Sequence, residues 1–147
     1  MWPKFSRQSV SAVVAATEIA QQKGGAGVDT EHLLLGVLSQ ADTIASQILE
    51  RLGLRFEQVE AEVHKIISLE SPYEVPVEGI LLTSQSKKAL SLSNKIAQQA
   101  AQEYVGTEHL LLGLIEEKEG FAYQVLTKLG VSGEGVRAEL LKFENGQ

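Results

Sequence analysis

The sequence predicts an all-α fold that consists of two tandem four-helix repeats. Three observations support this prediction. The segment Thr30–Gly36 returns as Thr107–Gly113. Apolar residues recur at helical spacing through both halves of the chain. No segment shows the clean period-two alternation of a half-buried strand; Pro76 argues against a central strand in the nearest candidate, residues 75–77. The chain, residues 1–147, is therefore expected to form a single domain of eight helices.

The two copies are separated by 77 residues (107 − 30 = 77), and this offset holds without a gap far beyond the seven-residue identity. Repeat one is assigned to residues 6–67, a linker to 70–82, and repeat two to 83–143. A repeat of this length in one register indicates a duplicated structural unit. Matching pairs at the end of the third helix are Leu49 and Leu126, Leu52 and Leu129, and Gly53 and Gly130.

The first two helices of each copy are predicted from their apolar patterns and caps. Ser6 is expected to cap the first helix, which ends at the glycine-rich residues 24–27. Its buried stripe is expected to contain Val10, Val13, Val14 and Thr17. Thr30 is expected to cap a second, central helix, with Glu31 in its first turn and leucines on almost every face. The fifth helix is expected to run longer than the first.

The third helix is expected to follow Asp42 and to stop at Gly53, and the fourth to begin at Phe56. Prolines in the linker predict an extended segment there. Leucines of the second and third helices of each copy are expected to be buried. They are Leu34, Leu35, Leu49 and Leu52 in repeat one, with Leu111, Leu112, Leu126 and Leu129 in repeat two.

The composition argues against several function classes. The chain has no cysteine, so disulfides, thiolate nucleophiles and cysteine-based zinc sites are ruled out, and a reducing compartment such as the cytoplasm fits. The net charge is −6 with scattered Lys and Arg, whereas nucleic-acid binding needs a cationic face. No apolar run approaches the roughly 18 residues of a membrane span. We therefore expect neither nucleic acid nor membrane as a partner.

No motif indicates catalysis or a cofactor. The chain lacks a Walker-type phosphate loop, and neither Glu31-His32 nor Glu108-His109 is followed by the second histidine of a zinc H-E-x-x-H motif. We interpret both motif histidines as structural residues that bond a backbone group near a helix start, and His64 as a surface residue. The sequence therefore predicts no enzyme activity, no metal and no cofactor.

The doubled T-E-H-L-L-L-G motif, with Leu-Gly closing the third helix of each copy, resembles the Clp N-terminal repeat domain, which precedes the ATPase rings of Clp-type AAA+ unfoldases. The resemblance extends from about Phe5 to Phe143. It is greatest to the ClpC branch, whose second repeat begins like Thr83–Ala89 here, with the ClpA and ClpB branches as alternatives. It implies a pseudo-twofold bundle of eight helices that docks adaptors and protein substrates for the unfoldase ring.

The resemblance also implies ligand-binding residues. In ClpC-type proteins of some bacteria this domain recognises arginine-phosphorylated substrates, and glutamates of the two motifs line the pockets. By motif, these are Glu31 and Glu108, beside Thr30 and Thr107. A helix start can hold a phosphoryl group while the carboxylate pairs with the guanidinium. The simpler interpretation is that both glutamates only favour the helix dipole.

Repeat one departs from the ClpC pattern before its threonine. It has Asp29 there, where repeat two keeps the usual glycine as Gly106. Asp29 adds a negative charge beside the first motif, so we expect the second motif to bind phosphoarginine more tightly.

Three functions are consistent with the resemblance and the motif search. The leading one is a docking module for adaptors and substrates of the Clp unfoldase system, either part of a longer ATPase or standing alone, with the ATPase ring as its partner in cis or in trans. The second is a freestanding Clp-repeat accessory protein that regulates the machine in trans, as in plastids, which would place the chain in the stroma. The third is an enzyme of unknown type, which no motif supports. The linker and first helix differ from the ClpC pattern, so the particular adaptor is not implied.

Overall fold

The computed structural model describes residues 4–22, 27–65, 74–77 and 80–145. The described residues form eight helices and one short hairpin, and the all-α fold class is confirmed. Repeat one contains α1 (Arg7–Gln22), α2 (Thr30–Ser39), α3 (Ile44–Arg51) and α4 (Phe56–His64). Repeat two contains α5 (Ser84–Gln99), α6 (Thr107–Glu117), α7 (Phe121–Lys128) and α8 (Gly133–Glu144).

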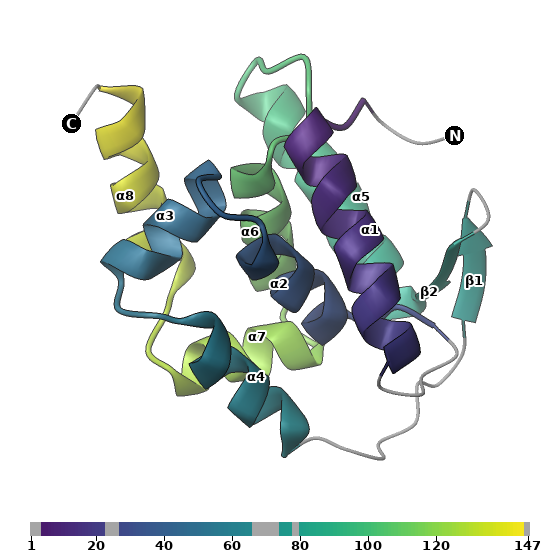
Figure 1. Ribbon diagram of the computed structural model, residues 1–147. Coiled ribbons are helices and arrows are strands. Elements are labelled where there is room, and N and C mark those ends of the chain that lie inside the picture. The colour runs from purple at the N-terminus through teal and green to yellow at the C-terminus, as the bar shows by residue number, and fades with distance from the viewer. Residues whose placement is uncertain (1–3, 23–26, 66–73, 78–79, 146–147) are drawn as a thin grey trace.

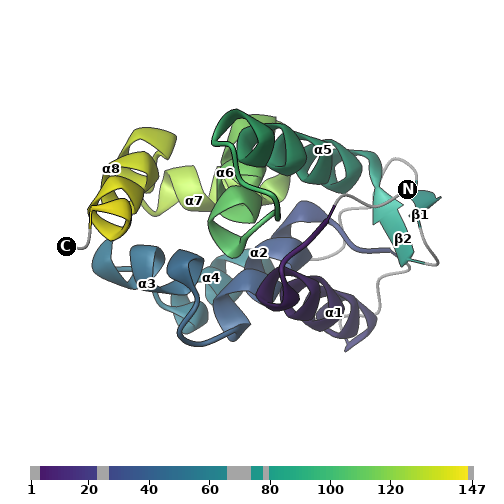
Figure 2. The same cartoon turned by 90° about the horizontal axis from the view of Figure 1, so that it is seen from above.

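The helices of the two repeats pack side by side (Figures 1 and 2), and their buried residues form one core. Helices α2 and α6 lie at the centre and contact each other, with α1 packed on α2 and α5 packed on α6. The remaining helices cross between repeats, since α3 packs on α8, α4 on α7, and α2 on α7. Each repeat therefore buries its apolar faces against the other as well as within itself.

The backbone repeats with the period of the sequence. Helices α1 and α5 begin and end 77 residues apart (84 − 7 = 77; 99 − 22 = 77). Phe5 forms a parallel bridge with Val105, and Leu82 forms the equivalent bridge with Val28 (82 − 5 = 77; 105 − 28 = 77). In both places, residues that precede the first helix of one repeat pair with residues that precede the second helix of the other.

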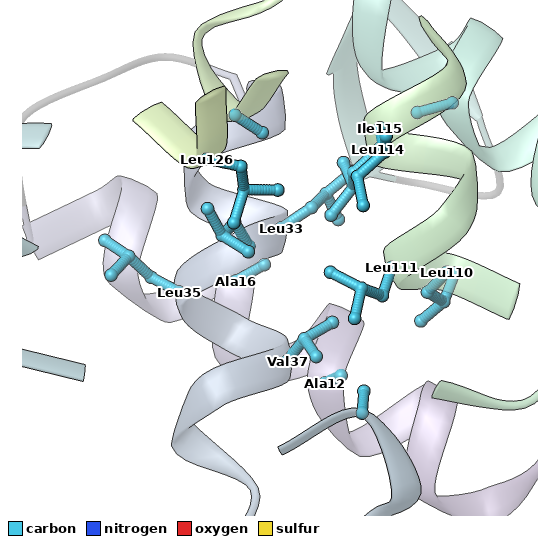
Figure 3. Close-up of a cluster of buried hydrophobic side chains, with 14 of the residues drawn as sticks. Ala12, Ala16, Leu33, Leu35, Val37, Leu110, Leu111, Leu114, Ile115 and Leu126 are labelled. Atoms are coloured by element: carbon cyan, nitrogen blue, oxygen red, sulfur yellow. The ribbon is translucent and has the colours of Figure 1, made fainter. Parts of the chain in front are cut away.

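The centre of the core is formed by leucines of α2 and α6. Leu34 and Leu111 have no exposed surface. Figure 3 shows Leu33 of α2 beside Leu114 of α6, and both border the same small space between the central helices. A helix that is apolar on nearly all sides has to be buried, and this prediction from the sequence is confirmed.

The predicted stripe of the first helix is wrong in part. Val13 is buried, but Val10 is 48% exposed and Val14 is 50% exposed. The reason is a close approach of α1 and α2, where a side chain at Gly36 would collide with the backbone of Ala12. Small side chains therefore line the buried face of α1. This face consists of Ser9, Ala12, Val13, Ala16 and Ala20.

Helix ends account for further differences and agreements. Ser6 caps α1 as predicted, with its Oγ accepting from the amide of Ser9 at 3.1 Å. Leu52 and Leu129 were expected to be buried but are only half-buried, because each is the C-cap of its helix and lies next to a glycine at positive φ at the surface. The prediction that the fifth helix is longer than the first is also wrong, since α1 and α5 each have 16 residues. Gly24, Gly25 and Ala26, and residues 66–67, lie outside the described residues.

The linker contains strands that the sequence pattern did not predict. β1 (Glu74–Val77) pairs antiparallel with β2 (Ile80–Thr83), and Pro76 lies opposite Leu81. β1 pairs with β2 and with no other described strand, so it has one free edge where the missing proline donor is tolerated. The hairpin leads directly into α5, since Thr83 is both the last residue of β2 and the N-cap of α5.

Candidate functional site

The two T-E-H motifs begin helices α2 and α6, but their threonines do not cap those helices. The N-cap of α2 is Asp29, whose Oδ1 accepts from the amide of Thr30 at 2.8 Å. The N-cap of α6 is Gly106, and Thr107 is the first helical residue. The expectation that Thr30 caps its own helix is therefore wrong, because a side chain one position earlier takes that role in repeat one.

Each motif threonine instead caps a helix of the opposite repeat. Thr30 Oγ1 accepts from the amide of Ala122 in α7 at 3.1 Å. Thr107 Oγ1 accepts from the amide of Ala45 in α3 at 3.3 Å. The two bonds are equivalent under the 77-residue offset, and both threonines are almost fully buried. The threonines thus join the repeats by satisfying backbone donors at helix starts.

The motif histidines fold back onto the residues that precede their helices. Nδ1 of His32 accepts from the amide of Asp29 at 2.9 Å, and Nδ1 of His109 accepts from the amide of Gly106 at 2.8 Å. Both rings are at least nine-tenths buried. The prediction of structural histidines bonded to a backbone group is confirmed, and His64 is exposed as predicted.

The motif glutamates occupy different environments. Glu31 is 9% exposed, and its Oε1 has no hydrogen-bond partner. Burial and the neighbouring Asp29 carboxylate raise the pKa of the Glu31 carboxyl to about 8. A backbone hydrogen bond acts in the opposite direction but is the smaller effect. At pH 7 this group is therefore mainly a neutral acid. Glu108 is only half-buried and remains in contact with solvent.

Asp29 and Gly106 cause this difference between the motifs. A side chain at Gly106 would collide with the Glu108 carboxylate, so glycine leaves the space over the helix start to Glu108. In repeat one the Asp29 carboxylate lies at this position, and its Oδ1 also accepts from Thr83 Oγ1 at 2.8 Å. The first motif is therefore closed by its own side chains, whereas the second leaves its glutamate accessible.

A groove that the sequence analysis did not predict lies at the C-terminal end of α5, between α6 and α8. Its volume is about 350 Å³, within the range of ligand pockets. Leu141 is 57% exposed at its edge. In the sequence, the available signal for this groove was the leucine at position 141 of the last predicted helix. The groove is lined by Ile96, Gln99, Ala100, His109, Leu112, Arg137, Leu140, Leu141 and Glu144.

The groove combines apolar walls with a few polar groups. Arg137 pairs with Glu116 of α6. Burial lowers the pKa of the His109 imidazole, while the Glu108 and Glu144 carboxylates act to raise it. The ring is thus neutral at pH 7, and the groove offers apolar contact area with a small number of hydrogen-bonding groups.

Among the described residues, no cluster of His, Asp or Glu has the composition to hold a metal ion. The helices in that same part of the chain are too short or too polar to cross a membrane.

Comparison with known proteins places these features in a family. The chain matches the family described as Clp repeat (R) N-terminal domain over residues 4–129, with a second match over 81–146. The chain belongs to this family. The overlapping matches agree with a domain in which each repeat carries one T-E-H motif.

Two curated relatives show how this Clp N-terminal domain compares in sequence. It is 37% identical over 142 residues to the chaperone protein ClpB of Oceanobacillus iheyensis and 36% identical over 142 residues to the chloroplastic chaperone protein ClpC of Pisum sativum. Each alignment covers 97% of the chain, but only 17% of the ClpB relative and 15% of the ClpC relative. The chain therefore spans less than a fifth of the length of these relatives.

Solved structures show the same fold. The N-terminal domain of ClpD from Arabidopsis thaliana superposes with a TM-score of 0.77 at 20% identity, covering 97% of this chain and 95% of that chain. A complex of the ClpV N-domain with VipB peptide superposes with a TM-score of 0.69 at 17% identity, covering 90% and 82%. A Clp N-domain of this fold thus binds a peptide in that complex.

Proposed function

We propose that this Clp N-terminal domain is a non-catalytic docking module that binds apolar peptide segments of adaptors or substrates and presents them to a Clp ATPase ring. The observation that carries the proposal is the groove between α5, α6 and α8. Its apolar walls and open edge suit side chains that leave water on binding. The peptide complex of the similar ClpV N-domain supports the same class of partner.

The groove is a feature of repeat two. Leu141 corresponds to His64 in repeat one, and Arg137 corresponds to Glu60 (141 − 64 = 77; 137 − 60 = 77). At these two positions repeat one therefore lacks the leucine and the arginine that line the groove of repeat two.

Replacing Leu141 by Gln is expected to weaken peptide binding about tenfold or more, because the leucine side chain loses its apolar burial against the ligand. Fluorescence anisotropy with a short labelled peptide rich in Leu and Val measures the affinity. Val14→Gln is the matched control, since Val14 is similarly exposed but lies on α1, away from the groove lining. Equal losses in both variants, or none in Leu141→Gln, would contradict the assignment.

We further propose that the second T-E-H motif recognises phosphoarginine. The accessible Glu108 carboxylate lies at the start of α6, where the free amides and positive end of the helix suit a phosphoryl group and the carboxylate suits a guanidinium. The first motif is the weaker candidate, because Glu31 is buried and mainly uncharged at pH 7.

Calorimetry with free phosphoarginine tests this second proposal. Glu108→Gln is expected to reduce the affinity about tenfold or more, since a charged hydrogen bond is lost, while Glu31→Gln leaves it nearly unchanged. Inorganic phosphate and arginine serve as ligand controls. No heat at millimolar phosphoarginine, or an affinity that Glu108→Gln does not alter, would leave both glutamates as helix-start residues.

A further inference from the structure

The ring of His109 lines the groove, and one of its two nitrogens is engaged with the backbone. Nδ1 accepts from the Gly106 amide at 2.8 Å, so Nδ1 carries a lone pair and the proton of the neutral imidazole lies on Nε2. No described group bonds to Nε2. Among the described residues, the buried side-chain atoms without a hydrogen-bond partner are Glu31 Oε1, Ser86 Oγ and Glu117 Oε2. Nε2 of His109 is not one of them. Nε2 therefore keeps contact with solvent. The groove that His109 lines is the open space beside the ring.

We propose that the Nε2–H group of His109 donates a hydrogen bond to a main-chain carbonyl of an apolar peptide that lies extended in the groove. This inference rests on the proposed docking function and names the backbone conformation that the groove selects. The aliphatic side chains that line the groove, Ile96, Leu112 and Leu140 among them, provide no hydrogen-bonding groups. When a ligand displaces water from such a surface, the Nε2–H donor needs a new acceptor, since a buried donor left unpaired weakens binding.

The charges around the ring favour a neutral acceptor. The carboxylates of Glu108 and Glu144 both act on His109, and a ligand carboxylate would add a third negative charge beside them. Arg137 offers limited compensation because Glu116 already pairs with it. A peptide carbonyl has the required lone pairs without the charge.

An extended peptide supplies such a carbonyl, and the body of a helix does not. In an α-helix each carbonyl except those of the last turn is bonded within the helix. In an extended segment the carbonyls are free. A donor in the groove therefore distinguishes unfolded or extended segments from folded helical ones, which is a useful selectivity for a module that presents chains to an unfoldase.

The test uses His109→Glu, in which a carboxylate at the third helical position still accepts from the Gly106 amide, as glutamate does in a capping box, but cannot donate. We expect binding of the labelled Leu- and Val-rich peptide to weaken about fivefold or more. His32→Glu makes the same replacement at the equivalent position of repeat one and is expected to leave binding unchanged. Circular dichroism verifies that both variants fold.

A second readout separates hydrogen bonding from the added charge. In a peptide series, each amide in turn is replaced by an ester, whose carbonyl is a weaker acceptor. Wild type should lose affinity at one position in particular, and His109→Glu should show no loss there. The Nε2 proton of His109 should also become observable by NMR in the complex. Uniform losses along the series, or a bound peptide that NMR shows to be helical through the groove, would overturn the inference; absence of wild-type binding would overturn the docking function itself.

Discussion

Replacing either Leu34 or Leu111 by Ala is expected to lower the free energy of unfolding by about 2–5 kcal/mol. Both side chains have no exposed surface and occupy equivalent positions in the central helices α2 and α6. Truncation removes apolar burial and leaves a cavity that close-packed neighbours fill only in part. This loss is a large share of the about 5–15 kcal/mol that stabilises a typical domain. Urea unfolding followed by circular dichroism measures it.

The same experiment tests whether the repeats fold as one unit. Because α2 contacts α6 and α7, and Thr30 and Thr107 bond across the repeats, each variant should unfold in a single transition. Leu141→Ala is the control, since an exposed leucine should change the stability by less than about 0.5 kcal/mol. Separate transitions for the two halves would show that the shared core contributes little to cooperativity.

The stability of the domain is expected to fall as pH rises from about 4.5 to 8, and Glu31→Gln is expected to remove much of this dependence. Burial and the Asp29 carboxylate raise the pKa of Glu31 from 4.5 to about 8 in the native state. Between these values the native protein holds a proton that the unfolded chain releases, so each rise in pH favours unfolding. The slope is at most about 1.4 kcal/mol per pH unit.

Urea unfolding of wild type and Glu31→Gln at a series of pH values isolates this contribution. The variant should be more stable than wild type at pH 8 and should show little advantage at pH 4.5, because glutamine resembles the protonated acid. Glu108→Gln is the control at the equivalent, half-buried position. A pH profile that is the same in wild type and in Glu31→Gln would mean that Glu31 ionises in the native state as it does in the unfolded chain.

Much of the fold follows from local patterns, and the histidines illustrate this. His32 and His109 lie three residues after the N-cap positions of their helices, where a side chain can reach back to the N-cap amide. The structure places their Nδ1 atoms 2.9 Å and 2.8 Å from those amides. Such contacts depend on a few consecutive residues, so sequence spacing is sufficient to predict them.

The errors of the sequence analysis arise where distant segments meet. Val10 and Val14 fit a helical apolar stripe, yet both are exposed, because Gly36 of α2 requires small side chains on the facing surface of α1. The role of Thr30 was missed for the same reason. Its hydroxyl partner is Ala122, 92 residues away, and a helix cap from another repeat leaves no mark on local spacing.

For the candidate sites as well, the sequence located the residues and the tertiary structure decided their environment. The 77-residue repeat located both T-E-H motifs and their glutamates, since identical residues in one register identify equivalent positions. The sequence also singled out Asp29 as the departure between the motifs. Only the tertiary structure showed that Asp29 bonds to Thr83 across the repeats, that Glu31 is buried, and that Glu108 stays accessible.

The sequence by itself determined the helix content, the duplication and the family resemblance, because these depend on periodicity and on residues that are near one another in the chain. The tertiary structure decided which motif remains open and where the groove lies. The groove requires the C-terminal end of α5, the start of α6 and the outer turns of α8 to come together, and their residues span 96–144. A binding surface of this kind arises from packing between helices, whose burial and charges depend on neighbours far apart in sequence.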